Sequence, residues 1–379
     1  MTATFLISFY GIVCILMIVF NLCYLRWERV RTKRMDRRCE RMGDELKREI
    51  ARNLAFPSED HRLMLERRLR RLTDLESFDL TMEQLATADP AASERYLGGI
   101  SSIFDHLAPR FSGNNELRRA YFDSLVRRWY RARLAGSAVM DKLIADLSSH
   151  ALSTRQNALE ALVEVASPEQ ITQALNVVDR APVLHSTRLI AEALMAFPGD
   201  SELLNDEIHR AFPGFSDCIK VAIAGYLRLS DARRGAASAE QRARALRILA
   251  VAEDESTPKE LKLACMRYFM SNPCEGARSM LMQAAGETRA SSWEIPVVAT
   301  QALGSYPGDD TVQTLKHCLT SPIYHVRFNA AASLRQLGVR KADLADIIEG
   351  DDRYAKEMVL YPWADEDESA SAEREGGAS

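Results

Sequence analysis

The stretch Val326-Arg-Phe-Asn-Ala-Ala-Ala-Ser-Leu-Arg-Gln-Leu-Gly338 decides the fold class of this chain. Its run of small residues lets a neighbouring helix approach closely, and Leu334 and Leu337 are spaced to face a core. Gly338 is the residue type that most often ends a helix in the left-handed conformation. The stretch therefore predicts the second helix of a helical hairpin.

The same frame recurs upstream at nearly constant spacing. One large apolar residue in each repeat sets the register: Leu162, Leu194, Leu227, Phe269, Leu303 and Leu334. One helical turn earlier stands a smaller apolar partner: Ala158, Ile190, Ile223, Cys265, Ala299 and Ala330. We expect both sets to be buried. The single long interval, between Leu227 and Phe269, contains the polar segment 231–240, which we interpret as an exposed loop.

Two repeats match almost letter for letter, Ala193-Leu-Met-Ala-Phe-Pro-Gly-Asp200 and Ala302-Leu-Gly-Ser-Tyr-Pro-Gly-Asp309. Ser167-Pro-Glu-Gln170 and Thr257-Pro-Lys-Glu260 are predicted capping boxes, with proline at the first helical position. Together these patterns resemble the HEAT/armadillo class of helical repeats over residues 118–348. The resemblance implies an all-α chain, an α-solenoid of helical hairpins, and a binding surface, but it names no partner.

A different pattern opens the chain. Residues 3–25 carry no charged side chain, and about 20 apolar residues suffice to span a bilayer, so a transmembrane anchor is predicted over residues 1–25. A cleaved signal peptide is the alternative, but no positive charge precedes the apolar run and no small-x-small cleavage site follows it. Residues 26–41 hold eight basic and three acidic side chains. The positive-inside rule then predicts a single-pass protein of the cell membrane, with the N-terminus outside and the repeat domain cytoplasmic.

Composition divides the rest of the chain. We predict a basic juxtamembrane helical stalk (26–57), an N-terminal helical or capping region (58–135), HEAT-like repeats (136–348) and an acidic disordered tail (349–379). The basic segment 26–41 would also adhere to anionic lipid. The acidic tail suits either a solubilising end or a ligand for a basic surface.

Two arginine-rich segments allow two interpretations each. The leucines of His61–Leu75 fit a basic amphipathic helix lying on a membrane, or a capping helix that packs on the repeats. Arg127-Arg-Trp-Tyr-Arg-Ala-Arg133 has a composition that can bind nucleic acid or phosphate groups. It equally suits a solvated helix face with Trp129 or Tyr130 turned inward.

No common catalytic or nucleotide-binding motif occurs, and the seven histidines are scattered singly. The seven cysteines form no C-x-x-C pair, which suits a reducing compartment and buried thiols. We therefore expect no catalytic, cofactor-binding or metal-binding residues, no nucleic acid partner, and a protein that is not an enzyme.

Four basic residues recur seven positions before the register residue of their repeats: Arg155, Lys220, Lys262 and Arg327. They are our candidate binding residues. In HEAT-like proteins this position commonly bonds to neighbouring repeats, so a structural ladder is one interpretation. A stripe that receives an acidic partner segment or phosphate groups is the other.

The function that these patterns favour is a membrane-tethered scaffold that binds a protein partner, itself membrane-associated, at the cytoplasmic face. The alternatives are a regulatory subunit of a membrane enzyme or transporter, or a HEAT-like enzyme such as a lyase. The oligomeric state stays open.

Overall fold

The computed structural model describes residues 16–17, 19–20, 24, 26–27, 44–131, 136–183, 185–233, 238–287, 292–360 and 363. Within these residues the chain is helical and contains no strand, which confirms the all-α prediction. The described residues fall into two compact units, unit 1 up to residue 165 and unit 2 from residue 166. We describe each unit by itself.

Unit 1 packs helices of varied length. Its elements are α2 (Glu59–Arg68), α3 (Leu72–Ala88), α4 (Pro90–Ile100), α5 (Ser102–Leu107), η1 (Ala108–Phe111), α6 (Glu116–Trp129), α7 (Ala138–Asp146) and α8 (Leu152–Val165). Helix α8 packs against both α6 and α7, and α3 packs against α4. The rings of Phe78, Phe104, Phe111 and Phe122 meet in its core. Leu65 and Leu69, from the arginine-rich segment, are buried.

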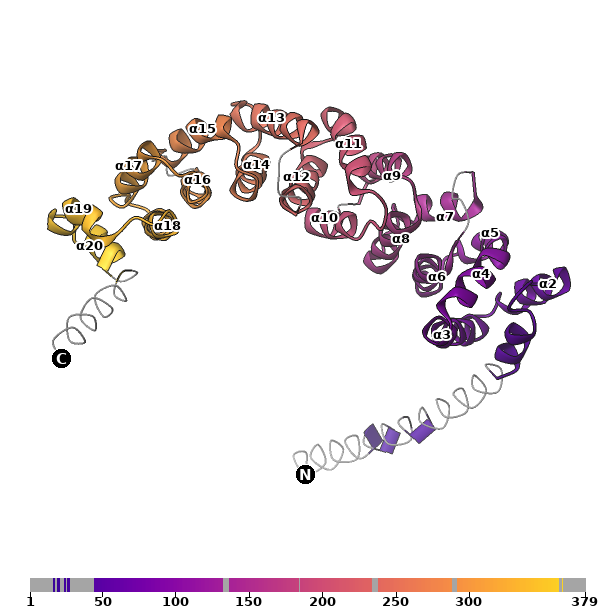
Figure 1. Ribbon diagram of the computed structural model, residues 1–379. Coiled ribbons are helices and arrows are strands. Elements are labelled where there is room, and N and C mark those ends of the chain that lie inside the picture. Colours follow the sequence, from indigo (N-terminus) through magenta and orange to yellow (C-terminus); the bar gives the residue numbers. More distant parts are fainter. Residues whose placement is uncertain are drawn as a thin grey trace, which may run out of the picture. The chain divides into compact units, whose positions relative to one another are not determined.

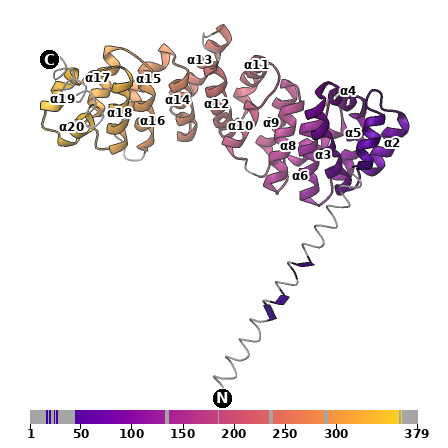
Figure 2. The ribbon, with the colours of Figure 1, turned by 60° about the horizontal axis from the view of Figure 1, so that its bottom comes forward.

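Unit 2 is a double layer of helices (Figures 1 and 2). The elements of one layer are α10 (Thr187–Met195), α12 (Asp217–Ala232), α14 (Lys259–Ser271), α16 (Glu294–Leu303) and α18 (Tyr324–Gln336). The elements of the other layer are α9 (Pro168–Arg180), α11 (Ser201–Ala211), α13 (Ala239–Glu253), α15 (Glu275–Ala285) and α17 (Asp309–Cys318). Consecutive helices within the first layer contact one another from α10 to α18. The predicted stacking of helical hairpins is thereby confirmed for this unit.

The unit continues with η4 (Lys341–Leu344), α19 (Ala345–Glu349) and α20 (Arg353–Leu360), and η2 (Phe212–Gly214) follows α11. Helix α20 packs on α18. Trp363 is fully buried, and its Nε1 donates a hydrogen bond to the carbonyl oxygen of Val339 at 3.0 Å. The end of the described chain is thus fixed beside the end of α18.

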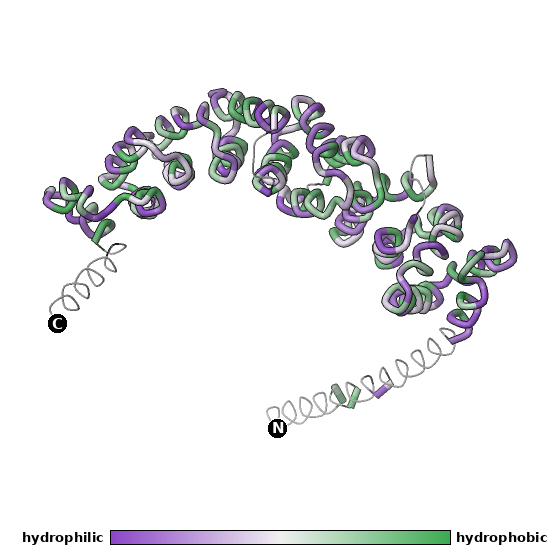
Figure 3. Tube along the Cα trace, viewed as in Figure 1, coloured by the Kyte–Doolittle hydropathy of each residue, from purple (hydrophilic) through white to green (hydrophobic). Residues whose placement is uncertain are grey.

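The register residues are where the spacing predicts them. All six register residues and all six of their smaller partners are almost completely buried. Each helix therefore shows hydrophobic and hydrophilic sides along its length, visible as alternating green and purple in Figure 3. Burying a leucine-sized side chain contributes about 1.5–3 kcal/mol, so this repeated pattern is the main stabilising contribution that the sequence encodes.

The quoted stretch ends as a glycine-terminated helix. Gly338 has φ of 77°, its N–H bonds to the carbonyl oxygen of Arg335, and the N–H of Val339 bonds to that of Leu334. This pair of bonds is a Schellman motif, which satisfies carbonyls that the helix end leaves open. Leu334 is fully buried, whereas Leu337 is only half-buried.

Two local predictions need correction. Ser167 and Gln170 form the expected capping box at the start of α9, but α14 begins at Lys259 with Pro258 at its cap and no capping side chain. Segment 231–240 is not simply an exposed loop, because α12 extends to Ala232 and Asp231 is buried. The ion pairs of Asp231 described below explain its burial.

The predicted membrane location is also corrected. Among the described residues, no helix is both long enough and apolar enough to cross a membrane. This finding contradicts the prediction of a single-pass protein with its N-terminus outside and its repeats cytoplasmic. Most of the predicted anchor, and most of the basic segment 26–41, lies outside the described residues.

Candidate functional site

The two arginines of the predicted basic set bind the turn that precedes their own helix. Nη1 of Arg155 donates hydrogen bonds to the carbonyl oxygens of Ser149 and His150 at 2.7 and 2.9 Å. Nη1 of Arg327 donates to the carbonyl oxygen of Ser321 at 2.6 Å. Ser149 lies six residues before Arg155, and Ser321 lies six residues before Arg327, so the equivalent positions in the two repeats make equivalent bonds. These bonds stay within one repeat and do not bridge to the next.

The two lysines make weaker contacts. Nζ of Lys220 lies 3.9 Å from a carboxylate oxygen of Asp217, one turn earlier on α12. Lys262 is half-buried on α14, the next helix of the same layer. Hydrogen bonds from Ser256 lower the pKa of Asp254, and the charge of Lys262 lowers it further. The structure thus places Lys220 and Lys262 on adjacent helices, with Arg327 two helices farther along and Arg155 in the other unit.

Exposed aromatic side chains lie on α18, the helix of Arg327, and on the two helices α16 and α20 packed against it. Trp293, Tyr324, Phe328 and Tyr354 are 44%, 52%, 51% and 63% exposed, and His325 is exposed as well. They come from the starts of α16, α18 and α20. We call these five side chains, together with Arg327, the aromatic patch. Single exposed apolar residues are ordinary on protein surfaces, but a contiguous group on adjacent helices marks an interaction site.

Four rings of the aromatic patch contact one another, and the fifth, that of Tyr354, contacts Arg327. Tyr324 and Phe328, one turn apart on α18, stack with centroids 6.2 Å apart. His325 lies 5.5 Å from Tyr324 and 6.1 Å from the ring of Trp293, so it joins α18 to α16. The guanidinium of Arg327 lies over the ring of Tyr354, 5.3 Å from its centre. These contacts link α16, α18 and α20 through the side chains of the patch.

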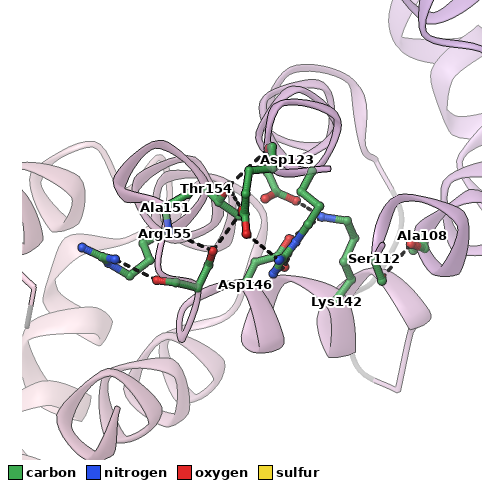
Figure 4. A network of polar contacts seen from close by, with 11 residues as sticks. Ala108, Ser112, Asp123, Lys142, Asp146, Ala151, Thr154 and Arg155 are labelled. Carbon is green, nitrogen blue, oxygen red and sulfur yellow. Dashed lines mark hydrogen bonds and ion pairs between the residues drawn. The ribbon is translucent and has the colours of Figure 1, made fainter. Parts of the chain in front are cut away.

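A buried ionic network lies in unit 1 (Figure 4). Nζ of Lys142 donates to Asp123 and to Asp146, each at 2.5 Å, and all three side chains are almost completely buried. Arg119 binds Asp146 through Nε at 2.9 Å and Glu116 through Nη1 at 3.1 Å. Burial raises the pKa of Asp123 to about 8, against the opposing effect of Lys142. The network joins α6 to α7 and belongs to the core of the unit.

A second buried network lies in unit 2. Arg244 is 1% exposed and binds Glu202, Asp206 and Asp231 at 2.8–2.9 Å. The hydroxyl of Tyr268 donates to the other oxygen of Asp231 at 2.9 Å. One guanidinium therefore connects α11, α12 and α13. Removing one partner of such a buried group leaves an uncompensated charge, so we assign this network a structural role.

A cavity of about 390 Å³ lies beside this second network. Its polar lining includes Asp231, Gln241, Arg242, Tyr268, Asn272 and Cys274. None of these is a histidine, so the thiol of Cys274 has no imidazole base there with which to act as a nucleophile. Among the described residues, no group of three or more histidine, cysteine or acidic side chains is arranged to hold a metal ion. The cavity offers hydrogen bonds without a recognisable catalytic pair.

The aromatic residues of the arginine-rich cluster that begins at Arg127 are turned inward, while Arg127 and Arg128 stay partly exposed. Trp129 and Tyr130 are buried, and Nε1 of Trp129 donates to Asp79 at 2.7 Å. Arg128 binds the same carboxylate, and Arg127 pairs with Glu160. The structure favours the second interpretation of this cluster, in which its aromatic residues pack inside.

Sequence reasoning identified Arg327 but missed the rings around it. Tyr324, His325 and Phe328 stand close together in the sequence, and their spacing on a helix was the available signal. Trp293 and Tyr354 come from other helices, so only the packing of α16, α18 and α20 brings them to the patch.

The expectation of buried cysteine thiols was too simple, because Cys265 and Cys318 are buried while Cys218 is exposed and Cys274 is half-buried.

Of the comparisons with known proteins, the one with solved structures gives matches. No protein-family model and no curated protein matches this chain. Seven solved chains match, among them human deoxyhypusine hydroxylase in complex with glycerol. That match has 15% sequence identity and a TM-score of 0.27, and it covers 80% of this chain and 94% of the hydroxylase. That structure is of an enzyme, which stands against the prediction that this protein is not one; the prediction is withdrawn, and the likeness carries no activity over to this chain.

Proposed function

We propose that this protein is a helical-repeat scaffold that binds a protein partner through the aromatic patch of unit 2. The observation that carries the proposal is the exposure of Trp293, Tyr324, Phe328 and Tyr354 around one arginine. Tryptophan, tyrosine and arginine are the residues most enriched among those that contribute most of the binding energy at protein interfaces. The aromatic patch gathers all three types on adjacent helices.

The geometry of the patch also suits a macromolecular partner. Its residues stand at the starts of α16, α18 and α20, and each of these helices buries apolar side chains in unit 2. A backbone fixed by helix packing loses little further freedom when a partner binds, and this reduces the entropic cost of association. A scaffold built from stacked repeats offers such a surface without needing a closed pocket.

The basic residues extend the proposed surface. Arg327 lies within the aromatic patch, and Lys220 and Lys262 stand in the same layer on α12 and α14. We assign the two lysines to the rim, where charges guide the approach of an acidic partner segment and contribute little to the final affinity. Arg155 lies in unit 1 and is buried against its own turn, so we leave it out of this surface.

Site-specific photo-crosslinking tests the proposal. A benzophenone amino acid would replace Tyr324, and in a matched control it would replace Leu246, which is 59% exposed on α13 in the other layer. After irradiation in the producing cells, we expect a discrete protein adduct from position 324. The control should give no such adduct, and Tyr354→Ala should reduce the adduct from position 324.

Three results would contradict the proposal. The first is no adduct at position 324, and the second is equal labelling at 324 and 246. The third is an adduct that nuclease digests, because exposed rings also stack on the bases of single-stranded nucleic acid. The third result would assign the patch to nucleic acid.

A further inference from the structure

The chain beyond Trp363 begins with an unbroken acidic run, Asp365-Glu-Asp-Glu368. Residues 364–379 hold six acidic side chains and one arginine and lie outside the described residues. The point from which they depart is fixed, because Trp363 is buried and bonded to Val339. Val339 is the third residue after the last residue of α18. The acidic run is therefore tethered to one end of α18.

The short chain between Trp363 and Glu368 keeps the acidic run close to α18. An extended residue spans at most about 3.6 Å, so the Cα atom of Glu368 lies within roughly 18 Å of the Cα atom of Trp363. Helix α18 has 13 residues, and at 1.5 Å per residue it is about 20 Å long. The acidic run can thus reach most of the length of α18 when it extends along that helix. Short flexible tethers hold two groups at effective concentrations in the millimolar range.

The outward side of α18 complements an acidic segment. Tyr324, Phe328, Ala332 and Arg335 are exposed at helical spacing and form one stripe, which we call the α18 stripe. Helix α18 contains two arginines and no acidic residue. Arg327 contacts a carbonyl oxygen and a tyrosine ring, both of them neutral, within the described structure. The positive charge of α18 and the attachment point of the acidic run therefore both favour residues 364–379 as the segment that binds this helix.

We propose that residues 364–379 dock in cis on the α18 stripe and so compete with the partner for the aromatic patch. The inference rests on the proposed function for the identity of the site, and it adds a means of regulating that site. Exposed ion pairs contribute little individually. The docked segment is therefore held weakly, and a partner that buries the exposed rings displaces it.

Intramolecular photo-crosslinking tests this docking in the full chain, without any partner. The benzophenone amino acid would replace Ala332, with Leu246 on α13 as the matched control, and mass spectrometry would identify the joined peptides. We expect position 332 to join peptides from residues 364–379 at about ten times the control yield, given millimolar effective concentration. Raising the ionic strength from about 0.15 to 1 M shortens the Debye length from about 8 to 3 Å and should reduce this yield severalfold.

A second variant isolates the acidic run. Asp365→Asn, Glu366→Gln, Asp367→Asn and Glu368→Gln together keep the length of the segment and remove its first four charges. The cis crosslink from position 332 should then fall severalfold, and partner capture at position 324 should rise. An unchanged cis crosslink in this variant would overturn the proposal, as would control-level yield in the wild-type segment.

Mixing isotopically light and heavy protein separates cis docking from binding between copies. Joined peptides of mixed isotope composition would show that a second copy occupies the stripe, which would overturn docking in cis. The crosslink at position 332 needs no partner, whereas the adduct at position 324 requires one. The docking can therefore fail while the proposed function stands, and the reverse outcome is equally distinguishable.

Discussion

The guanidinium of Arg327 lies over the ring of Tyr354, with its carbon 5.3 Å from the ring centre, and so connects the start of α18 to the start of α20. The same side chain binds the carbonyl oxygen of Ser321. Arg327 therefore has two roles in one place. It stabilises the turn before α18, and it brings a positive charge into a group of exposed rings. A cation over an aromatic face contributes about 0.5–1 kcal/mol at an exposed site.

Leu303→Ala should destabilise unit 2 locally. Leu303 is fully buried on α16, which packs between α14 and α18, so the truncation opens a cavity that costs roughly 2–5 kcal/mol. Hydrogen exchange should increase first in α14, α16 and α18, since each repeat contacts mainly its neighbours. Leu246→Ala, at an exposed position on α13, is the control and should change little. A uniform increase that reached α10 equally would show that unit 2 unfolds as one core.

The burial of Leu303 and its equivalents could be predicted because a helical repeat must hide one side of every helix. Periodicity states this requirement directly, and the alternation of small and large apolar residues in the register frame carries it. The predicted exposure of Asp231 failed for the opposite reason. A polar residue near a composition change looks like a loop, and no local pattern shows that Arg244, thirteen residues later, turns back to neutralise it.

The candidate site was predictable only in part. Arg327 was found from its repeat position, but an exposed aromatic residue has no sequence signature that separates it from a core residue at the same helical spacing. Phe328 and Tyr324 on α18 are exposed, whereas Phe122 on α6 is buried. The difference arises from which neighbouring helix covers each position, which is a property of packing and not of the helix itself.

Lys142→Met should destabilise unit 1 strongly. The side chain of Lys142 is almost completely buried between Asp123 and Asp146, and removing it leaves the buried carboxyl groups of both residues without their shared donor. Breaking a buried ion pair in this way typically costs about 3–5 kcal/mol. The protein is equilibrated in urea and digested briefly with a protease, and the amount of peptides released from residues 116–165 measures the change in stability. Arg52→Met is the control within the same unit, since its ion pair with Glu49 is largely exposed and should contribute little. Equal effects of the two substitutions would contradict the structural role assigned to the network.

Asp123→Asn should alter how the stability of unit 1 depends on pH. Aspartate in an unfolded chain has a pKa of about 3.9, and the pKa of Asp123 in the folded chain is about 8. The folded state holds this proton more tightly, so its contribution to stability is complete below about pH 4 and is lost as the pH rises towards 8. Within that window the loss is at most about 1.4 kcal/mol per pH unit.

The measurement for Asp123 is the free energy of urea unfolding of unit 1 at pH 6 and pH 8, in the wild type and in Asp123→Asn. The wild type should lose more stability between the two pH values than the variant does, because asparagine cannot ionise. The difference between the two proteins isolates this carboxyl from other titrating groups. Parallel losses in both would mean that Asp123 does not govern the pH dependence.

Substitution of Arg327 and substitution of the two lysines, Lys220 and Lys262, should have different effects on stability and on partner capture. Arg327→Gln removes a charge-assisted hydrogen bond to a carbonyl oxygen, worth about 1.5–3 kcal/mol, so hydrogen exchange at the start of α18 should increase. Lys220→Gln combined with Lys262→Gln removes two charges that make weak contacts, so the melting temperature should hardly change. If these lysines form the rim of the partner surface, the double variant should still weaken partner capture at position 324. The remaining capture should then respond less to added salt, because fewer exposed charges contribute to it. Unchanged capture together with a lower melting temperature would remove both lysines from the binding surface and leave Arg327 as its basic residue.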